Sequence, residues 1–176
     1  MGHTEKFMAL YLSVHMTTGG FTSEQLELEE QVLVLPHCDL KDAVTIGEIA
    51  VQLARRESLA ISIEVRLGEW TVFHTALPGA KPEQPSWIAR KARVVMATGH
   101  STMLERVKAE EAGIDWYATY GLPEETHAIH GGGLPLNVSG QGLAGILLIS
   151  GLPQVEDHLF GIRVITEFLA QVGENE

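Results

Sequence analysis

The stretch from residue 130 to residue 158 restricts the possible folds most, because glycine turns, apolar runs and a helix start follow one another directly. Gly140 and Gly142 bracket a turn between two apolar runs, which predicts a β-hairpin. The second run, Leu143 to Ile149, is aliphatic and short, as in a strand buried on both faces. Pro153 then suits the first position of a helix. We therefore expect a hairpin, a helix and one ligand-facing corner between them.

Acidic and histidine side chains gather at the start of this helix. Glu156 and Asp157 fall in its first turn, where negative charge complements the exposed N–H groups. His158 follows at the margin of the expected buried stripe, which comprises Val155, Leu159, Ile162, Leu169 and Val172. We interpret this arrangement as a half-buried polar cluster suited to ligand binding. It also suits acid–base chemistry, with His158 or His130 acting beside Asp157.

Three consecutive glycines precede the hairpin, and their backbone can approach a ligand closely because it carries no Cβ atoms. They are Gly131, Gly132 and Gly133. An anion-binding nest is one interpretation of such a triplet, and a tight turn is the commoner one. His127 and His130 could meet Asp157 and His158 at a metal ion, but their spacings match no recognised ligand signature. We therefore predict no metal site.

A strand and a helix are expected between residues 31 and 57. Gln31 to Leu35 is aliphatic and β-branched, Pro36 stops it, and Asp39 offers a carboxylate as the helix N-cap. The helix from residue 40 to residue 57 carries one apolar stripe along its small side chains. A second stripe comprises Ile46, Ile49 and Leu53. Because a small sheet covers only one stripe, the second indicates a subunit interface.

The clearest strand is Leu59 to Leu67, where aliphatic residues alternate strictly with others. Gly68 and Glu69 would form a two-residue loop, and the resulting hairpin would pair Ile63 with His74. His74 would then point into the apolar face. There it could be a ligand-binding or proton-transfer group in a pocket. The commoner case is a neutral core histidine that is bonded to a backbone carbonyl.

The basic cluster of the chain lies on another expected helix, which Ser86 caps and Gly99 ends. Its cations are Arg90, Lys91 and Arg93. In so acidic a chain they could hold the carboxylate or phosphate of a ligand, although a solvated face is the commoner outcome. His100 falls at the corner before the next helix, for which Thr102 to Glu105 reads as a capping box.

Composition restricts domain number, partners and compartment. A chain of 176 residues with 45% hydrophobic content suits one domain, which we place at residues 23–176 after an extension of residues 1–22 that could be poorly ordered. The net charge of −11 argues against nucleic-acid and anionic-membrane partners. The apolar run Phe7 to Val14 is too short to span a bilayer. Cys38, the single cysteine, suits a reducing compartment, so we expect a cytoplasmic protein.

Several segments, in this order, carry a resemblance to a known family. They are LEEQVLVLPHCD, Phe73-His74, Leu77-Pro78-Gly79, Trp87-Ile88 with Arg90-Lys91, Gly99-His100-Ser101, HGGGLPL and SGLPQVEDH. Over residues 25–172 the chain resembles the haem-degrading domain family of GlcG-like and HbpS-like proteins, in a branch of small stand-alone proteins without an assigned activity. Cys38 stands where relatives are expected to carry an aromatic residue.

The resemblance implies an α+β, profilin-like fold, with an antiparallel sheet and helices packed against it. It also implies assembly into homodimers or rings of dimers, and binding of haem or another small ligand. A haem site needs an axial ligand and cations for the propionates. The candidate axial ligands are His74, His100, His130 and His158, and the candidate cations are Arg90, Lys91 and Arg93.

Three functions stay open from the sequence. The first is an oligomeric protein that binds a small anionic or haem-like ligand without catalysis. The second is an enzyme that degrades haem or acts on a small hydroxy or keto acid, with His158 or His130 as the acid–base group. The third is a protein-interaction module without a ligand. A pocket that encloses His100, His130 and His158 together would favour the first two.

Overall fold

A four-stranded antiparallel sheet organises the molecule in the computed structural model, which describes residues 2–8 and 17–175. The strands are β1 (Ser62–Leu67), β2 (Trp70–Ala76), β3 (Gly133–Val138) and β4 (Gly142–Ser150). They lie in the order β2-β1-β4-β3, and each neighbouring pair is antiparallel. The predicted hairpin between the two apolar runs is therefore confirmed as β3 and β4. Two hairpins thus pair along β1 and β4.

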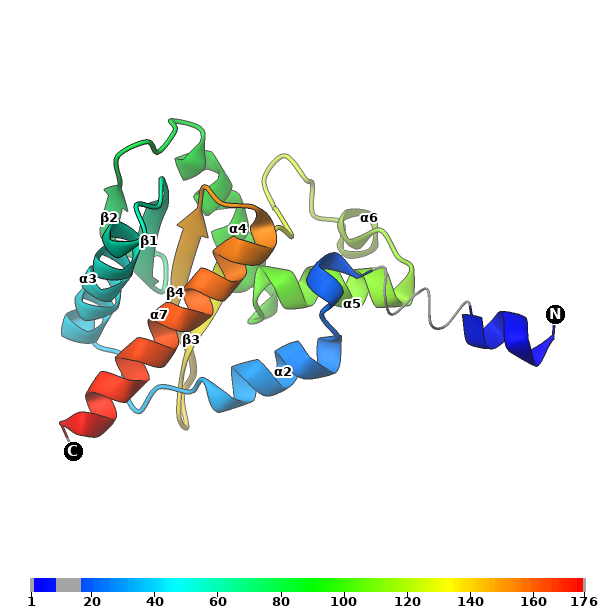
Figure 1. Ribbon diagram of the computed structural model, residues 1–176, viewed down its shortest axis with the longest axis horizontal. Helices are drawn as coiled ribbons and strands as arrows, with labels where there is room; N and C mark the ends of the chain where they lie inside the picture. Colours follow the sequence, from blue (N-terminus) through cyan, green and yellow to red (C-terminus); the bar gives the residue numbers. More distant parts are fainter. Residues whose placement is uncertain (1, 9–16, 176) are drawn as a thin grey trace.

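Helices cover both faces of this sheet (Figure 1). On one face, α3 (Leu40–Arg56) and α7 (Gln154–Glu174) enclose the larger core, which includes Ile63, Leu147 and Phe160. On the other face, α4 (Gln84–Thr98) packs its apolar side chains against Ile146 and Leu148 of β4. Because successive side chains of β4 point to opposite faces, both of its faces are buried. The predicted doubly buried strand is confirmed.

Three shorter helices and a 3-10 turn extend the structure beyond the sheet. They are η1 (Thr18–Gly20), α2 (Ser23–Val32), α5 (Thr102–Ala112) and α6 (Trp116–Tyr120). Helix α2 lies along α5, and the two share a small apolar cluster that includes Leu26, Met103 and Leu104. Residues 3–8 are helical as well. This arrangement brings the segment that contains Phe21 and Glu29 next to the start of α7, where both contact His158.

Helix α3 begins as predicted, because Asp39 accepts a hydrogen bond from the backbone N–H of Asp42, and the side chain of Asp42 accepts one from Asp39 in return. Its two apolar stripes merge into one buried face, since β1 and β2 cover part of it and α7 covers the rest. Ile46 and Ile49 of the second stripe are buried within the chain itself. The second stripe is therefore no evidence for a subunit interface.

The expected strand at residues 31–35 is wrong. Helix α2 continues to Val32, and Leu35 forms only an isolated parallel bridge with Val138. A capping box explains the difference, because the Thr22 hydroxyl accepts from the backbone N–H of Gln25 and the Gln25 side chain accepts from the N–H of Thr22. The helix that starts there extends through the glutamate-rich segment and into the β-branched residue that suggested a strand.

A β-bulge in the first hairpin overturns the predicted position of His74. Trp70 pairs with Leu67 as expected, but Phe73 pairs with Val65 and His74 pairs with Glu64. Phe73 packs its ring against Gly47 of α3, where a Cβ atom would collide with it. The extra residue lets two consecutive apolar side chains, Val72 and Phe73, reach the core on the α3 side. His74 is consequently turned to the opposite face and is exposed.

Helices α4, α5 and α7 each differ from the sequence expectation by a residue or a rotation. Helix α4 starts at Gln84 rather than after Ser86, and Ser101 rather than Thr102 caps α5. On α7 the fully buried face contains Phe160, Gly161, Val164, Ile165 and Phe168, while Ile162, Leu169 and Val172 of the predicted stripe lie partly buried beside it. Leu159 is exposed. Gly161 explains this rotation, because Leu134 of β3 occupies the space that a side chain would need there.

The N-terminal segment falls partly outside the described residues, and most of the apolar run from Phe7 to Val14 lies there. The chain from Thr17 onward contacts α5: the Thr18 hydroxyl donates to Glu110 at 2.8 Å, and the Ser23 hydroxyl donates to Glu111 at 2.6 Å. The extension of residues 1–22 stays a prediction. In the described ranges, no helix has both the length and the apolar character to cross a membrane.

Candidate functional site

A cavity of about 340 Å³ opens where β4 ends and α7 begins, with α4 as its other wall. Its lining combines polar side chains with the exposed backbone of the β4–α7 corner. The residues around it are Ala60, Gly79, Lys81, Glu83, Gln84, Trp87, Lys91, His130, Ser150, Gly151, Leu152, Gln154 and Asp157. The predicted ligand-facing corner between hairpin and helix therefore coincides with a cavity, whose volume lies within the roughly 300–1,000 Å³ of typical ligand sites.

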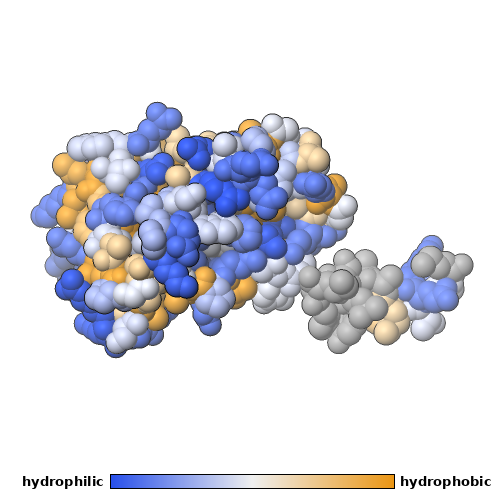
Figure 2. Space-filling model, turned by 90° about the horizontal axis from the view of Figure 1, so that it is seen from above, coloured by the Kyte–Doolittle hydropathy of each residue, from blue (hydrophilic) through white to orange (hydrophobic). Residues whose placement is uncertain are grey.

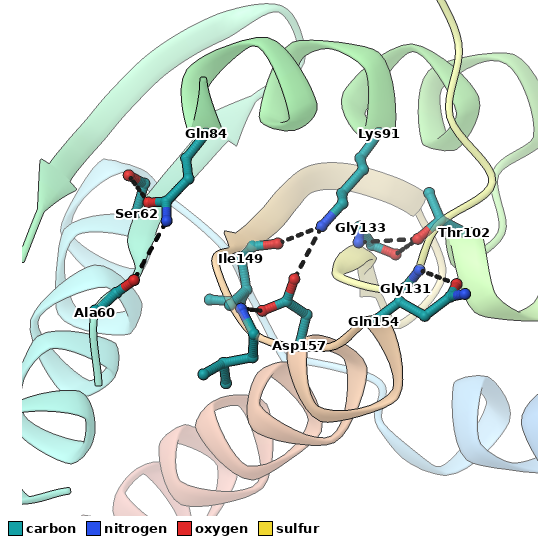
Figure 3. Close-up of polar contacts among 11 residues, drawn as sticks. Ala60, Ser62, Gln84, Lys91, Thr102, Gly131, Gly133, Ile149, Gln154 and Asp157 are labelled. Atoms are coloured by element: carbon teal, nitrogen blue, oxygen red, sulfur yellow. Dashed lines mark hydrogen bonds and ion pairs between the residues drawn. The ribbon is translucent and has the colours of Figure 1, made fainter. Parts of the chain in front are cut away.

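A buried ion pair forms one side of this cavity (Figure 3). The Lys91 Nζ atom lies 3.2 Å from Asp157 Oδ2 and donates a second hydrogen bond, of 2.8 Å, to the Ile149 carbonyl. Asp157 Oδ1 accepts from the backbone N–H of Leu152 at 3.0 Å. Both charged side chains are only 3% exposed. Lys91 of α4 is thus held at the end of β4 by the first turn of α7.

Burial changes the proton affinity of both partners. Desolvation raises the pKa of Asp157 to about 6, although the Lys91 ammonium and the Leu152 N–H oppose that rise. Desolvation also lowers the pKa of Lys91, against the pull of Asp157. Burial thus brings the proton affinities of the two groups closer together than they would be in water.

The glycine triplet fits against this pair. Gly132 has φ of 118°, and a Cβ atom there would collide with the Ile149 carbonyl oxygen and lie 2.8 Å from Lys91 Nζ. Gly131 donates its N–H to the Gln154 side chain at 3.3 Å, and Gly133 donates its N–H to the Thr102 hydroxyl at 3.0 Å. Gly132 is therefore required for close packing of the backbone on the ion pair, and Gly131 and Gly133 are required for close packing against Gln154 and Thr102.

Gln84 closes the opposite side of the cavity. Its side-chain oxygen accepts from the Ser62 hydroxyl at 2.8 Å, and its nitrogen donates to the Ala60 carbonyl at 3.3 Å (Figure 3). A Cβ atom at Gly151 would lie 2.8 Å from this Gln84 nitrogen. Sequence reasoning missed Gln84, because the residue precedes a proline at a helix start and only the long-range contact with β1 reveals its position.

His130 lies at the mouth of the cavity beside Trp87, with the ring centroids 4.8 Å apart in an edge-to-face arrangement. The Arg90 guanidinium lies over the Trp87 ring, 4.5 Å from its centroid. Burial, with help from the cations Arg106, Lys91 and Arg90, lowers the pKa of His130 to about 4. Its imidazole is neutral at physiological pH, and within residues 2–8 and 17–175 neither ring nitrogen has a hydrogen-bond partner.

The other three candidate histidines are each paired with a glutamate elsewhere. His74 Nδ1 lies 2.9 Å from Glu64, and His100 Nδ1 lies 2.8 Å from Glu30. These two, like the completely buried His158, are absent from the cavity lining. His158 Nε2 lies 2.8 Å from a carboxylate oxygen of Glu29 in α2. His100, His130 and His158 therefore share no pocket, so the observation that would have favoured ligand binding or catalysis by all three is not made.

The three cations of the basic cluster on α4 also lie in different surroundings. Lys91 is buried in the cavity wall, whereas Arg90 donates to the Glu124 carbonyl and Arg93 donates to the Thr126 carbonyl. Glu156 is exposed and is not part of the lining. The predicted ligand-binding residues that the structure brings together are thus Lys91, His130 and the ion-pair partner Asp157, with the glycine triplet behind them. In the part of the chain that the structure describes, no cluster of histidine, cysteine and carboxylate side chains is arranged to hold a metal ion.

Fold and cavity together define an α+β, profilin-like protein with a polar, ligand-sized site at one end of its sheet. The family described as "Haem degrading protein HbpS-like" matches residues 38–166, and the chain belongs to this family. A UPF0303 protein of Streptomyces avermitilis is 37% identical over 150 residues, which are 85% of this chain and 92% of the relative. A UPF0303 protein of Burkholderia cenocepacia is 34% identical over 152 residues, or 86% and 90% of the two chains.

Solved structures share the fold at lower sequence identity. The crystal structure of the Ybr137w protein superposes with a TM-score of 0.78 at 23% identity, over 85% of this chain and 88% of the other. HbpS gives a TM-score of 0.59 at 20% identity, over 76% and 90% of the two chains. The PduOC:Heme complex gives 0.62 at 20% identity, over 73% and 93%. These likenesses confirm the antiparallel sheet with helices against it.

Proposed function

We propose that this protein binds a small organic molecule that presents oxygen acceptors, such as a carboxylate or a ketone, in the cavity beside Lys91. The observation that carries the proposal is the hydrogen bonding of Lys91. An ammonium group has three N–H donors. Two of them are used by Ile149 and Asp157, and among the described residues no acceptor meets the third. A ligand oxygen would satisfy a buried donor that is otherwise costly to leave unmatched.

The remaining lining supports a ligand with one polar end and one flat or apolar end. Trp87 and His130 form an aromatic edge at the mouth, and the Lys81 ammonium is available there to a second charged group of the ligand. Lys81 and Lys91 are balanced by Glu83 and Asp157. Selectivity would therefore come from the placement of individual donors rather than from a strong positive potential.

Ligand-detected NMR with a panel of small carboxylates and keto acids tests this proposal. We expect saturable binding of at least one member, with affinity lowered about tenfold or more in Lys91→Met, because a hydrogen bond to a charged group contributes roughly 1.5–3 kcal/mol. Lys41→Met, which removes an exposed lysine on α3, is the matched control and should bind normally. Absence of binding across the panel, or equal binding by both variants, would contradict the proposal.

Haem is a second candidate ligand, and His130 is the specific observation that favours it. A neutral imidazole with an unpartnered ring nitrogen fits the requirement for an axial ligand to iron, and Lys81 with Arg90 could pair with the propionates. The bound iron would supply the redox chemistry, while these residues would hold and orient the macrocycle. The neighbours HbpS and PduOC, the latter solved with haem, make this ligand class a natural one to test.

A haemin titration followed by the Soret band distinguishes the four histidines. We expect a saturable shift in the wild-type protein that is lost in His130→Ala and kept in His74→Ala, His100→Ala and His158→Ala. The last three variants are matched controls, because those side chains contact glutamates away from the cavity. A shift lost in one of the controls instead would move the haem site, and a featureless titration would remove haem from the proposal.

For the enzymatic alternative, the geometry around α7 restricts which residues can act as acid–base groups in the cavity. His158 and Asp157 are adjacent in sequence, but they point to different surroundings, with Asp157 in the cavity wall and His158 against Phe21 and Glu29. An acid–base role in the cavity would accordingly fall to His130 and Asp157. Turnover of a bound keto acid that is abolished by both His130→Gln and Asp157→Asn would support this alternative over binding alone.

We also propose that the protein assembles into a homo-oligomer in the cytoplasm. Apolar side chains remain at the surface, including Leu28 and Val32 of α2 and Trp70 at the start of edge strand β2. Figure 2 shows hydrophobic residues in patches over the end of the molecule that carries α3 and the first hairpin. Cys38 is the single cysteine of the chain, which suits a reducing compartment because no internal disulfide can form.

A further inference from the structure

Lys91 has a second chemical capacity beyond hydrogen bonding. Lys91 lines the cavity, although its side chain is only 3% exposed. Gly132 packs closely on the backbone side of Nζ, since a Cβ atom there would lie 2.8 Å from the nitrogen, so a ligand would have to reach the amine from the cavity. A largely desolvated amine at the wall of a ligand-sized cavity meets one condition for a nucleophilic lysine, and a carboxylate 3.2 Å away can accept and return its proton.

The structure assigns Lys91 as an imine-forming amine for aldehydes and ketones that enter this cavity, with Asp157 as its proton acceptor and donor. This inference rests on the proposed function, because it specifies how a carbonyl ligand of that site would be held. It names a covalent mode of binding and a ligand class, carbonyl compounds, within the broader group of oxygen-bearing ligands.

The proposed step balances without any further reagent. Asp157 takes one proton from the Lys91 ammonium, and the neutral amine forms a C–N bond with the carbonyl carbon. One proton of the attacking nitrogen passes to the carbonyl oxygen, which becomes a hydroxyl. Asp157 then returns its proton to that hydroxyl, the C–O bond breaks, and water leaves. The products are a protonated imine on Lys91, an ionised Asp157 and one water molecule. Because no atom is oxidised or reduced, the reverse reaction releases the same ligand by hydrolysis.

Burial favours the proton transfer between Lys91 and Asp157, in addition to their geometry. Desolvation lowers the pKa of Lys91 and raises that of Asp157 to about 6, so transfer of the proton between them is easier than it would be for two groups in water. The other four lysines provide an internal comparison, since all of them are exposed. They are Lys6, Lys41, Lys81 and Lys108. Lys81 is the most informative, because it lines the same cavity without a buried environment.

Reductive trapping on the full-length protein tests the inference. The protein is incubated with benzaldehyde or pyruvate and cyanoborohydride, and the alkylated lysines are identified by peptide mass mapping over time. We expect Lys91 to be labelled at least about tenfold faster than Lys41 and Lys108, since a carbonyl compound held in the cavity meets this amine at a far higher effective concentration than one in free solution. In denaturant this preference should vanish. Labelling of Lys81 in place of Lys91, or equal labelling of all lysines in the folded protein, would overturn the assignment.

A parallel measurement separates this inference from the proposed function. Binding of pyruvate without reductant is followed by ligand-detected NMR on the wild-type protein and on Lys91→Arg, which keeps the charge but cannot form the imine. Pyruvate that binds yet never labels Lys91 would overturn the imine and leave the proposed binding function intact. A carbonyl probe that neither binds nor labels, together with a negative carboxylate panel, would overturn both.

Discussion

Glu29 of α2 and His158 of α7 are 129 residues apart in the chain, yet their side chains meet at 2.8 Å from carboxylate oxygen to Nε2. The neighbouring Glu30 contacts His100 at 2.8 Å and accepts the backbone N–H of Ser101 at 2.7 Å. Two consecutive glutamates therefore fasten α2 to two different parts of the molecule, the start of α7 and the corner between α4 and α5.

The contact between Glu29 and His158 should contribute more to stability than the contact between Glu30 and His100. The His158 side chain is completely buried and packs edge-on against Phe21, whereas that of His100 is 41% exposed. We expect His158→Ala to lower the free energy of unfolding by about 2–4 kcal/mol, and His100→Ala by about 1 kcal/mol or less. Urea denaturation with unchanged m-values measures both, and equal losses would contradict the difference in burial.

Asp157 and His130 should shift stability with pH in opposite directions. Burial raises the pKa of Asp157 from 3.8 to about 6, so between those values the folded protein binds more protons and becomes less stable as the pH rises. Burial lowers the pKa of His130 from 6.5 to about 4, so its contribution grows with pH over that window.

The two matching variants separate these contributions. Between pH 4 and pH 6, Asp157→Asn should make the slope of unfolding free energy against pH more positive, by up to about 1.4 kcal/mol per pH unit. His130→Gln should make the slope more negative over the same range. Urea denaturation at several pH values gives both slopes. Parallel profiles for wild type and variants would mean that neither pKa is shifted by burial.

Gly132 and Gly140 offer a matched pair of substitutions, since both have positive φ values, 118° and 77°. Gly132→Ala places a methyl group against the Ile149 carbonyl, Lys91 and Asp157, whereas nothing lies within 4 Å of a Cβ atom at Gly140. We expect Gly140→Ala to cost about 1 kcal/mol and Gly132→Ala to cost about 2–3 kcal/mol or more, with ligand binding weakened only in the latter. Equal thermal shifts and unchanged binding would contradict this assignment.

The assembly proposal makes a direct prediction about mass in solution. Light scattering at micromolar concentration should give at least twice the chain mass of 19.2 kDa. Trp70→Glu, at the exposed start of β2, should lower that mass if the edge strand takes part. A measured mass of 19.2 kDa throughout the concentration range would reject the oligomer.

Local sequence signals predicted much of the corner that carries the candidate site. The turn glycines and aliphatic runs defined the hairpin of β3 and β4, and the acidic first turn of α7 brought Asp157 to attention. These features depend on residues close together in the chain, where turn chemistry and charge at helix termini dominate. The proximity of Lys91 to Asp157 could not be predicted, because it depends on α4 and α7 meeting across the end of a strand.

The incorrect predictions share a physical cause in tertiary packing. Alternation could not reveal that β2 bulges to bring Phe73 over Gly47, which moves His74 to the other face. Periodicity likewise could not show that α7 rotates to seat Gly161 on Leu134. In each case a glycine on one element accommodates a large side chain from another element distant in sequence. Single-sequence patterns contain no information about which partner occupies that space.

The ion pair of Lys91 and Asp157 has a mechanical consequence. Lys91 belongs to the helix on one face of the sheet, Asp157 to a helix on the other, and the Ile149 carbonyl between them belongs to the strand itself. The ion pair thus links the two helix layers and the sheet at the end of β4. A ligand that neutralises Lys91, or accepts its third N–H, would change the contacts of α4 and of α7 at the same time. Amide exchange in α4 and in α7 would then slow together when the cavity is filled.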